Sequence, residues 1–318
     1  MARFKEFLVI NGVADLAALK SDDDRKVIVA AFAEQILWDR FDLKTSTCRG
    51  LISKVKKSAD ERWASCFGVK SNRRLAKVWH DMDATPAGIV RQAEEIDVAL
   101  LRASEKLAAR GSDVDQEHHD AVVTGFFYLC RGGEIVGDGG VLGAAPLATD
   151  DVSFLAKIQG EGHVPIALSA ASAWAAAATV KWRSSKTDRC GRGQVRGQAK
   201  IEDSLCPVDA LIRAARRRPG APVGAPLFAG VTYASLTAWI KKSACSAGKM
   251  DTDFMTHSMR RGGACAFFFA GATEYTLTYQ GRWSLKARGT QGVYANPTLE
   301  HVMSFTAAML RPFTALGY

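Results

Sequence analysis

The chain has 318 residues, and its 42 lysines and arginines outnumber its 33 aspartates and glutamates, which gives a formal net charge of +9 at pH 7. Hydrophobic residues make up 47% of the sequence and charged residues 24%, which excludes a disordered or fibrous chain and is typical of a folded globular protein. The length favours two domains. The positive charge favours a polyanionic partner, with nucleic acid as the leading candidate.

Several other classes of protein are disfavoured. No apolar run reaches the roughly 20 residues of a membrane span, and the N-terminus lacks the pattern of a secretory signal. The 7 cysteines are scattered singly, with neither a CxxC motif nor a Cys/His cluster at zinc spacing. The stretch "GDGGVLG" fails the GxGxxG spacing of a dinucleotide fingerprint, and there is no P-loop. We therefore expect an intracellular protein with reduced cysteines, no membrane, no metal and no cofactor.

The N-terminal part is predicted to be helical. Residues 24–43 place Ile28 and Phe32 on one stripe, and aspartates precede them at the end where the helix dipole favours negative charge. A second helix around "STCRGLISKVKKSADERWASCF" carries a basic outer face, which predicts either a phosphate-binding surface or an ordinary solvated one. Because the polar segment that follows ends in a turn signal at Pro86, we place a domain boundary near residue 82.

Beyond the boundary, the pattern predicts helices over residues 87–110 and from about 116 to 129. Residues 133–160 are glycine-rich and strand-like, and residues 178–201 have the pattern of two strands joined by a turn. Helical periodicity returns from Val208. The predicted fold is mainly α, with a helical domain over residues 1–82 and an α-rich domain with a small antiparallel sheet over residues 83–318.

One segment, "THSMRRGGACAFFFAGA", carries cations into an otherwise small and apolar helix. His257 and Arg260 are three residues apart, so both side chains point to one side near the helix N-terminus, where an anion is favoured. A guanidinium is a planar fork that matches phosphate oxygens. Arg131 can supply a second fork, with Glu134 three residues on to brace it, although each arginine alone is more commonly a surface ion pair or helix-end charge.

For several other residues, a purely structural role is the simpler interpretation. Residues 267–269, three phenylalanines, are expected in the core, and His118 and His119 at a solvated helix start. Tyr294, taken alone, is more commonly an ordinary tyrosine beside a turn.

Taken in order, Arg131, Lys186, His257, Arg260, Trp283 and Tyr294 resemble the signature of the tyrosine recombinase (phage integrase) family. The sequence around Lys186, "SSKTDRCGRG", is also similar to the hairpin of Crypton and DIRS mobile-element recombinases. The resemblance covers the chain from about residue 86 to the end. It implies a core-binding domain over residues 1–82 and a catalytic domain over residues 83–318, without metal or cofactor.

The resemblance also implies a role for each residue. Tyr294 would attack a phosphodiester and form a 3′-phosphotyrosyl bond, with Arg131 and Arg260 stabilising the charge of the transition state. His257 would take or share the tyrosine proton, and Lys186, or Lys181 in its place, would protonate the departing 5′ oxygen. Trp283 could donate one N–H to the phosphate and pack against the helix of the nucleophile.

Double-stranded DNA is the expected partner, and it would be held chiefly through its phosphates. The candidate phosphate contacts are Lys54, Lys56, Lys57, Arg73, Arg74, Lys181, Arg183, Arg189 and Arg192. The resemblance implies self-association on DNA, from dimer to tetramer, through the C-terminal helix that follows Pro297, which could equally be a packing helix of its own chain. Two other functions stay open: a DNA-binding protein that has the fold without the reaction, and a monomeric topoisomerase.

Overall fold

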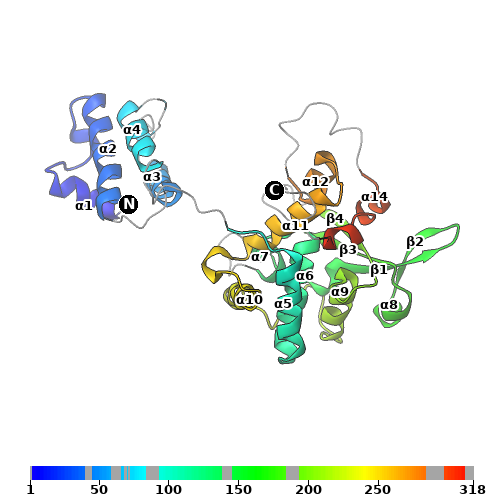
Figure 1. Ribbon diagram of the computed structural model, residues 1–318. Helices are drawn as coiled ribbons and strands as arrows, with labels where there is room; N and C mark the ends of the chain where they lie inside the picture. Colours follow the sequence, from blue (N-terminus) through cyan, green and yellow to red (C-terminus); the bar gives the residue numbers. More distant parts are fainter. Residues whose placement is uncertain are drawn as a thin grey trace. The chain divides into compact units, whose positions relative to one another are not determined.

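The computed structural model describes residues 2–39, 45–58, 66–67, 70, 72–83, 93–137, 145–183, 193–283 and 297–311. The chain divides into two compact units, Met1–Gln92 and Ala93–Tyr318 (Figure 1). The sequence placed a boundary near residue 82, whereas the structure divides the chain between residues 92 and 93.

The first unit is helical where it is described. Its elements are α1 (Ala2–Ile10), a 3-10 turn (Leu16–Ala18), α2 (Asp22–Asp39), α3 (Thr45–Ser58) and α4 (Arg73–Asp83). The helix expected over residues 24–43 is present as α2, with three aspartates in its first turn. Phe4 and Phe7 of α1 pack against Phe32 of α2, with ring centroids 4.8 and 5.2 Å apart, and Trp79 of α4 joins the same buried cluster.

The second unit is mainly helical with one small sheet. Its longer helices are α5 (Val98–Ala109), α6 (Asp113–Phe127), α9 (Pro207–Arg216), α10 (Tyr233–Ser246) and α11 (His257–Phe269). Its shorter helices are α7 (Gly132–Val136), α8 (Leu168–Trp174), α12 (Glu274–Gln280) and α14 (Leu299–Met303), with 3-10 turns at Thr149–Asp151, Asp251–Asp253 and Ala307–Leu310. No described helix is long and apolar enough to cross a membrane.

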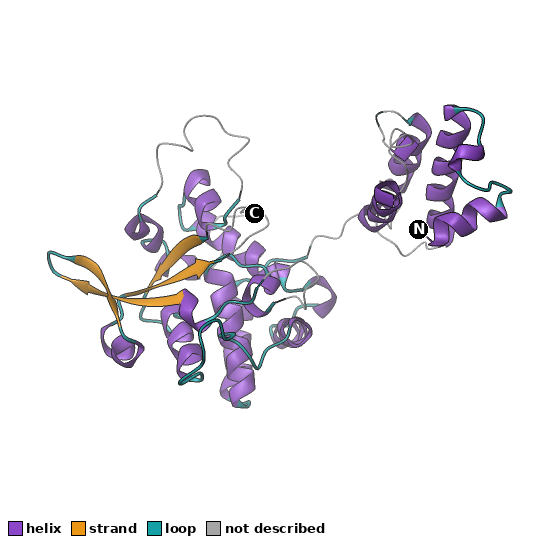
Figure 2. Ribbon diagram, turned by 180° about the vertical axis from the view of Figure 1, so that it is seen from behind, coloured by secondary structure: helices purple, strands orange, loops and turns teal. Residues whose placement is uncertain are grey.

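The sheet of this unit is antiparallel. Its strands are β1 (Val152–Ile158), β2 (Gly162–Ile166), β3 (Ala177–Trp182) and β4 (Gln194–Ala199), in the order β2-β1-β3-β4. The hairpin β1–β2 extends from the sheet to the outside of the unit (Figure 2). The two strands expected over residues 178–201 are present as β3 and β4, paired so that Trp182 lies opposite Gln194. The prediction of a mainly α chain with a small antiparallel sheet is thus confirmed at this level.

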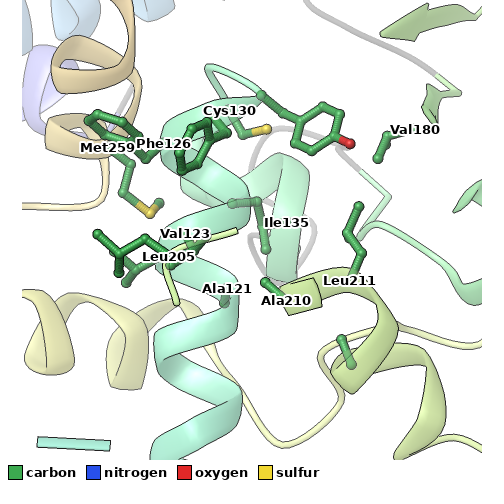
Figure 3. Close-up of a cluster of buried hydrophobic side chains, with 14 of the residues drawn as sticks. Ala121, Val123, Phe126, Cys130, Ile135, Val180, Leu205, Ala210, Leu211 and Met259 are labelled. Atoms are coloured by element: carbon green, nitrogen blue, oxygen red, sulfur yellow. The ribbon is translucent and has the colours of Figure 1, made fainter. Parts of the chain in front are cut away.

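Helix α6 forms the centre of the hydrophobic core of the second unit. Phe126 and Val123 are fully buried and lie beside Met259 of α11 (Figure 3). Leu211 of α9 and Val180 of β3 belong to the same buried cluster. The burial of these apolar side chains is the main favourable contribution to folding, at about 25 cal/mol per Å² removed from water. The core thereby fixes the ends of α6 and α11, which carry the residues of the candidate site.

Two sequence predictions differ from the structure at element boundaries. Of the helix expected over residues 87–110, residues 93–97 are not helical, and α5 begins at Val98, where Asp97 accepts a hydrogen bond from the Leu100 N–H at 2.9 Å. The preceding segment is extended because its backbone bonds to other parts of the chain: Glu94 N–H donates to Asp253 O at 2.7 Å and Ile96 N–H to Ser258 O at 3.2 Å. Tertiary hydrogen bonds here override helix propensity.

The strand-like prediction for residues 133–160 is wrong at its start, where the structure has helix α7. The Glu134 carboxylate accepts a hydrogen bond from the Arg131 N–H at 2.8 Å, which satisfies a donor at the helix N-terminus. Leu129, just before, has a left-handed φ of 53° that turns the chain between α6 and α7. In the described part of the predicted range, β1 is the one strand.

Two core assignments are also corrected. Phe267 is fully buried, but Phe268 and Phe269 are 55% and 39% exposed, because successive residues of a helix point in different directions. His118 and His119 are buried rather than solvated. The ring of His119 makes a 3.0 Å hydrogen bond with Ser104 Oγ.

Candidate functional site

The structure describes four of the six signature residues, Arg131, His257, Arg260 and Trp283, together with Glu134. The predicted nucleophile Tyr294 and the predicted general acid Lys186 lie outside the described residues, as do Arg189 and Arg192.

Arg131 and Glu134 lie at the N-terminus of α7 and contact each other. Arg131 Nη1 donates to Glu134 Oε1 at 2.9 Å, in addition to the backbone hydrogen bond that begins the helix. The Arg131 side chain is 32% exposed, whereas that of Glu134 is 6% exposed. The buried carboxylate thus holds an arginine that still has access to solvent.

Arg260 enters the same cluster from α11. Its side chain is 3% exposed, and its Nη1 lies 3.9 Å from Glu134 Oε2. Nη1 also donates to the Leu129 carbonyl at 2.9 Å, and Nη2 donates to the carbonyl of Gly281. The two arginines predicted to share a phosphate therefore converge on one carboxylate from helices far apart in the sequence.

A third arginine, Arg282, belongs to this cluster and was not predicted. Its Nη2 donates to Glu134 Oε2 at 2.6 Å, and its side chain is fully buried. The only sequence signal for Arg282 is its position beside Trp283, and a lone arginine there has the appearance of a surface cation.

The ring of Trp283 covers part of this cluster. The Arg260 guanidinium lies 4.7 Å from the Trp283 ring centroid, at the distance of a cation–π contact. A side chain at Gly281 would overlap that ring, which explains the glycine two residues before the tryptophan. Trp283 is 37% exposed, so the ring both covers Arg260 and faces solvent.

His257 is the first residue of α11 and is exposed at the surface. Its neighbour Thr256 lies against Gly132, where a Cβ would come within 2.6 Å of the Thr256 side chain, so the beginnings of α7 and α11 are adjacent. Partial burial, followed by the charges of Arg260, Arg131 and Arg261, lowers the pKa of His257. The imidazole is therefore neutral at pH 7 and able to accept a proton.

The cluster carries more positive than negative charge. Burial raises the pKa of Glu134, but Arg282, the Arg131 N–H, Arg260 and Arg131 together hold it below its usual value, so the carboxylate is ionised. Burial, then the charges of Arg282 and Arg131, lowers the pKa of Arg260 to about 10, which leaves it protonated at neutral pH. Three arginines around one carboxylate leave an unbalanced cationic site, which an oxyanion would neutralise.

Lys181, the predicted alternative to Lys186, is exposed on β3 next to this cluster. A small pocket is lined by Glu134, Pro146, Asp151, Lys181, Trp182 and Arg183. Lys181 therefore borders the carboxylate that holds Arg131, on the strand that leads to the segment carrying Lys186.

The predicted DNA contacts differ in their surroundings. Arg183 bonds to Asp150 and Asp151, both at 2.6 Å, so a phosphate would compete with two carboxylates for its guanidinium. The five predicted contacts of the first unit are all exposed: Lys54, Lys56 and Lys57 on α3, and Arg73 and Arg74 on α4. Among the described residues, no group of histidine, cysteine or acidic side chains is arranged to hold a metal ion.

The described part of the C-terminal segment packs on its own unit. Val302, Met303 and Met309 are buried, and Thr306 Oγ1 accepts a hydrogen bond from the Ala199 N–H of β4 at 3.0 Å. These contacts lie within one chain, and self-association through this segment stays a prediction.

No protein-family model matches the chain, and no curated protein or solved structure matches it significantly.

Proposed function

We propose that the chain is a tyrosine-type DNA strand transferase, a recombinase or integrase that mobilises a genetic element by cutting and rejoining DNA. The observation that carries the proposal is the convergence of Arg131 and Arg260 on Glu134, with His257 at the start of the helix that bears Arg260. These residues combine two phosphate-binding forks, a proton acceptor and a helix N-terminus at one place.

In the proposed reaction, Tyr294 Oη bonds to phosphorus while the bond to the 5′ oxygen breaks. The tyrosine proton passes to His257, and Lys186 or Lys181 gives a proton to the departing oxygen. A tyrosine of ordinary pKa, about 10, attacks poorly at neutral pH without a strong positive field. Arg131 and Arg260 supply that field and stabilise the charge that develops on the phosphate oxygens. Attack by another strand's 5′ hydroxyl reverses the step and joins the strands.

DNA binding in the proposal uses both units. The exposed lysines of α3 and the arginines at the start of α4 provide a basic surface on the first unit. Because each neutralised phosphate releases counterions, affinity should fall steeply as salt rises, whatever the DNA sequence.

The test is covalent capture. The protein is incubated with a library of random-sequence duplexes containing nicks, so that a short cleaved fragment diffuses away and the intermediate accumulates. Adducts that survive denaturation are isolated, and the attached peptide is identified by mass. The proposal expects an adduct on Tyr294 that is absent in Tyr294→Phe and enriches a DNA sequence.

Other outcomes select the alternatives. Adducts with no sequence preference, together with relaxation of supercoiled plasmid, would favour a topoisomerase. Tight DNA binding with no adduct on any duplex would overturn the proposed reaction and favour a DNA-binding protein.

A further inference from the structure

Arg282 has an unusual backbone conformation. Its φ is 57°, in the left-handed region, where non-glycine residues are uncommon and carry strain. Leu129 is the other non-glycine residue with positive φ among those described, and Arg282 Nη2 lies 3.3 Å from the Leu129 carbonyl oxygen. Two strained positions thus meet at the candidate site, which indicates that the surrounding contacts hold this geometry in place.

The side chain of Arg282 joins three segments of the second unit. Nη1 donates to the Tyr128 carbonyl at the end of α6 at 3.0 Å, and Nη2 donates to Glu134 of α7. The guanidinium lies 4.5 Å from the ring centroid of Trp182, the last residue of β3. Arg282 therefore connects the turn that carries Arg131 with the strand that carries Lys181.

Arg282 is the most buried of the three arginines around Glu134, and its guanidinium bonds to Tyr128, Leu129 and Glu134. Its effect on a substrate would therefore pass through these partners. Glu134 Oε1 accepts from the Arg131 side chain, while Oε2 accepts from the Arg131 N–H and from Arg282. Oε2 lies at the longer distance of 3.9 Å from Arg260. Arg282 thus occupies the carboxylate oxygen that would otherwise attract Arg260 most strongly.

We propose that Arg282 is a positioning residue that binds Glu134 and so leaves Arg260 available to an incoming phosphate. Without Arg282, the buried carboxylate would be balanced only by Arg131, which already bonds it, and by Arg260. Glu134 Oε2 would then draw the Arg260 guanidinium toward itself and away from the substrate. This inference rests on the proposed function for its catalytic consequence, but its structural part can be tested without any reaction.

The first measurement is the pKa of His257 by NMR titration. The charges that face this ring are Arg260, Arg131 and Arg261. In Arg282→Met, movement of Arg260 toward Glu134 should weaken the positive field of Arg260 at the ring, and the pKa of His257 should rise by about 0.5. Arg217→Met is the matched control, because Arg217 also pairs with a buried carboxylate, Asp120 at 2.8 Å, which keeps a second arginine.

The double variant Arg282→Met with Glu134→Gln makes the test specific. With the carboxylate gone, removal of Arg282 should no longer change the pKa of His257, so the double variant should match Glu134→Gln alone. An equal rise in both backgrounds would show that Arg282 acts independently of Glu134 and would overturn the proposal. If Arg282→Met does not fold, Arg282→Lys replaces it in the same titrations. Lysine keeps the charge but lacks the planar guanidinium that reaches Glu134, Tyr128 and Leu129 together.

The second measurement is the single-turnover rate of covalent adduct formation on a captured duplex. Arg282→Met should slow the reaction by about 10-fold or more while the Kd for DNA changes by less than about 2-fold, since phosphate contacts elsewhere dominate affinity. Arg217→Met should leave both values as in the parent. Equal loss of rate in the two variants would indicate general destabilisation and contradict the proposal. If the parent forms no adduct, the proposed function fails, and the His257 titration still decides the role of Arg282.

Discussion

Glu134 interacts with three arginines that come from three different segments of the chain. Arg131 follows α6, Arg260 lies in α11, and Arg282 follows α12. A buried carboxylate is costly unless its charge is balanced and its oxygens accept hydrogen bonds, and here both conditions are met. The same carboxylate lowers the cost of burying Arg260 and Arg282, so each charged group depends on the others.

Replacement of Glu134 by glutamine should therefore destabilise the second unit. Loss of the negative charge leaves buried arginines without a partner, and we expect a decrease in the free energy of unfolding of about 3 kcal/mol in urea titrations. Since the folded-state pKa of Glu134 lies below its ordinary value of 4.5, its contribution is complete above pH 4.5 and is lost as pH falls through the folded-state pKa. The unfolding free energy of Glu134→Gln should therefore lack the decrease that ionised Glu134 gives the parent as the pH falls below 4.5.

The control is Glu94→Gln, which changes an exposed glutamate of the same unit. Its unfolding free energy should stay within about 0.5 kcal/mol of the parent value. Equal stability of the Glu134 variant and the parent would mean that the arginines do not need the carboxylate.

In the proposed reaction, His257 should set how the rate falls at acid pH. The pKa of His257 lies below its ordinary value of 6.5, chiefly because of partial burial and then the nearby arginines. As a base it acts when neutral, so the rate of adduct formation should rise with pH, with a midpoint below 6.5, and then level off. Rates measured from pH 4.5 to 8 on one duplex would check this, and His257→Asn should remove this fall together with most of the rate. A midpoint above 6.5 would argue against His257 as the base.

The sequence predicts this site in part. The spacing of Arg131 and Glu134 predicted their contact, because residues three apart on a helix are neighbours. His257 and Arg260 were placed at the start of one helix by the same rule. Arg282 could not be found in this way, since its role depends on a left-handed backbone and on contacts with α6, α7 and β3 that no local pattern encodes.

At the scale of elements, α11 packs closely against two backbone segments. A Cβ on Gly262 would overlap the backbone of Ile96, and a Cβ on Gly263 would overlap the backbone of Phe126. The two glycines of the "RRGG" stretch therefore let α11 approach an extended segment and α6 at backbone distance. This approach places Arg260, two residues earlier, beside Leu129 and Glu134.

Substitution of either glycine by alanine should shift α11 and disturb the site. We expect Gly262→Ala and Gly263→Ala each to lower the free energy of unfolding by about 2 kcal/mol or more, because the overlapping atoms belong to backbone that cannot rotate away. Thermal melting would measure the loss. Gly50→Ala is the control: Gly50 lies in α3 with open space around its Cα, so the added methyl group should stabilise that helix by about 0.5–1 kcal/mol.

Elements whose pattern is local were predicted more accurately than those set by distant contacts. Helix α2 and the paired strands β3 and β4 lie close to where the sequence placed them. The start of α5 was predicted too early, and α7 was taken for strand, because Ile96 and Glu134 make bonds to residues remote in the sequence. Phe268 and Phe269 were expected in the core because they are apolar, but their positions on α11 point them outward.

At the scale of the whole molecule, each hydrophobic cluster among the described residues lies within one unit. The cluster around Phe32 and Trp79 draws only on the first unit, and the cluster around Phe126 and Leu211 only on the second. Each unit therefore has its own source of cooperative stability.

Unfolding should accordingly show two transitions in calorimetry. Leu75→Ala removes a fully buried side chain from the first core, and Leu101→Ala does the same in the second. Each variant should lower one transition and leave the other unchanged, with a loss of about 2–5 kcal/mol in the affected unit. A single transition lowered by both variants would contradict independent cores.

The packing of α11 against the extended segment also bears on how the second unit could be produced alone. Residues 94–97 precede its first helix, yet Ile96 covers Gly262, and Arg261 bonds to Glu95 and to the Ala93 carbonyl, at 3.1 and 2.9 Å. A truncation that begins at the helix, at Asp97, would uncover backbone that has no side chains to shield it. Expression of a stable C-terminal fragment therefore requires an N-terminus at or before Ala93.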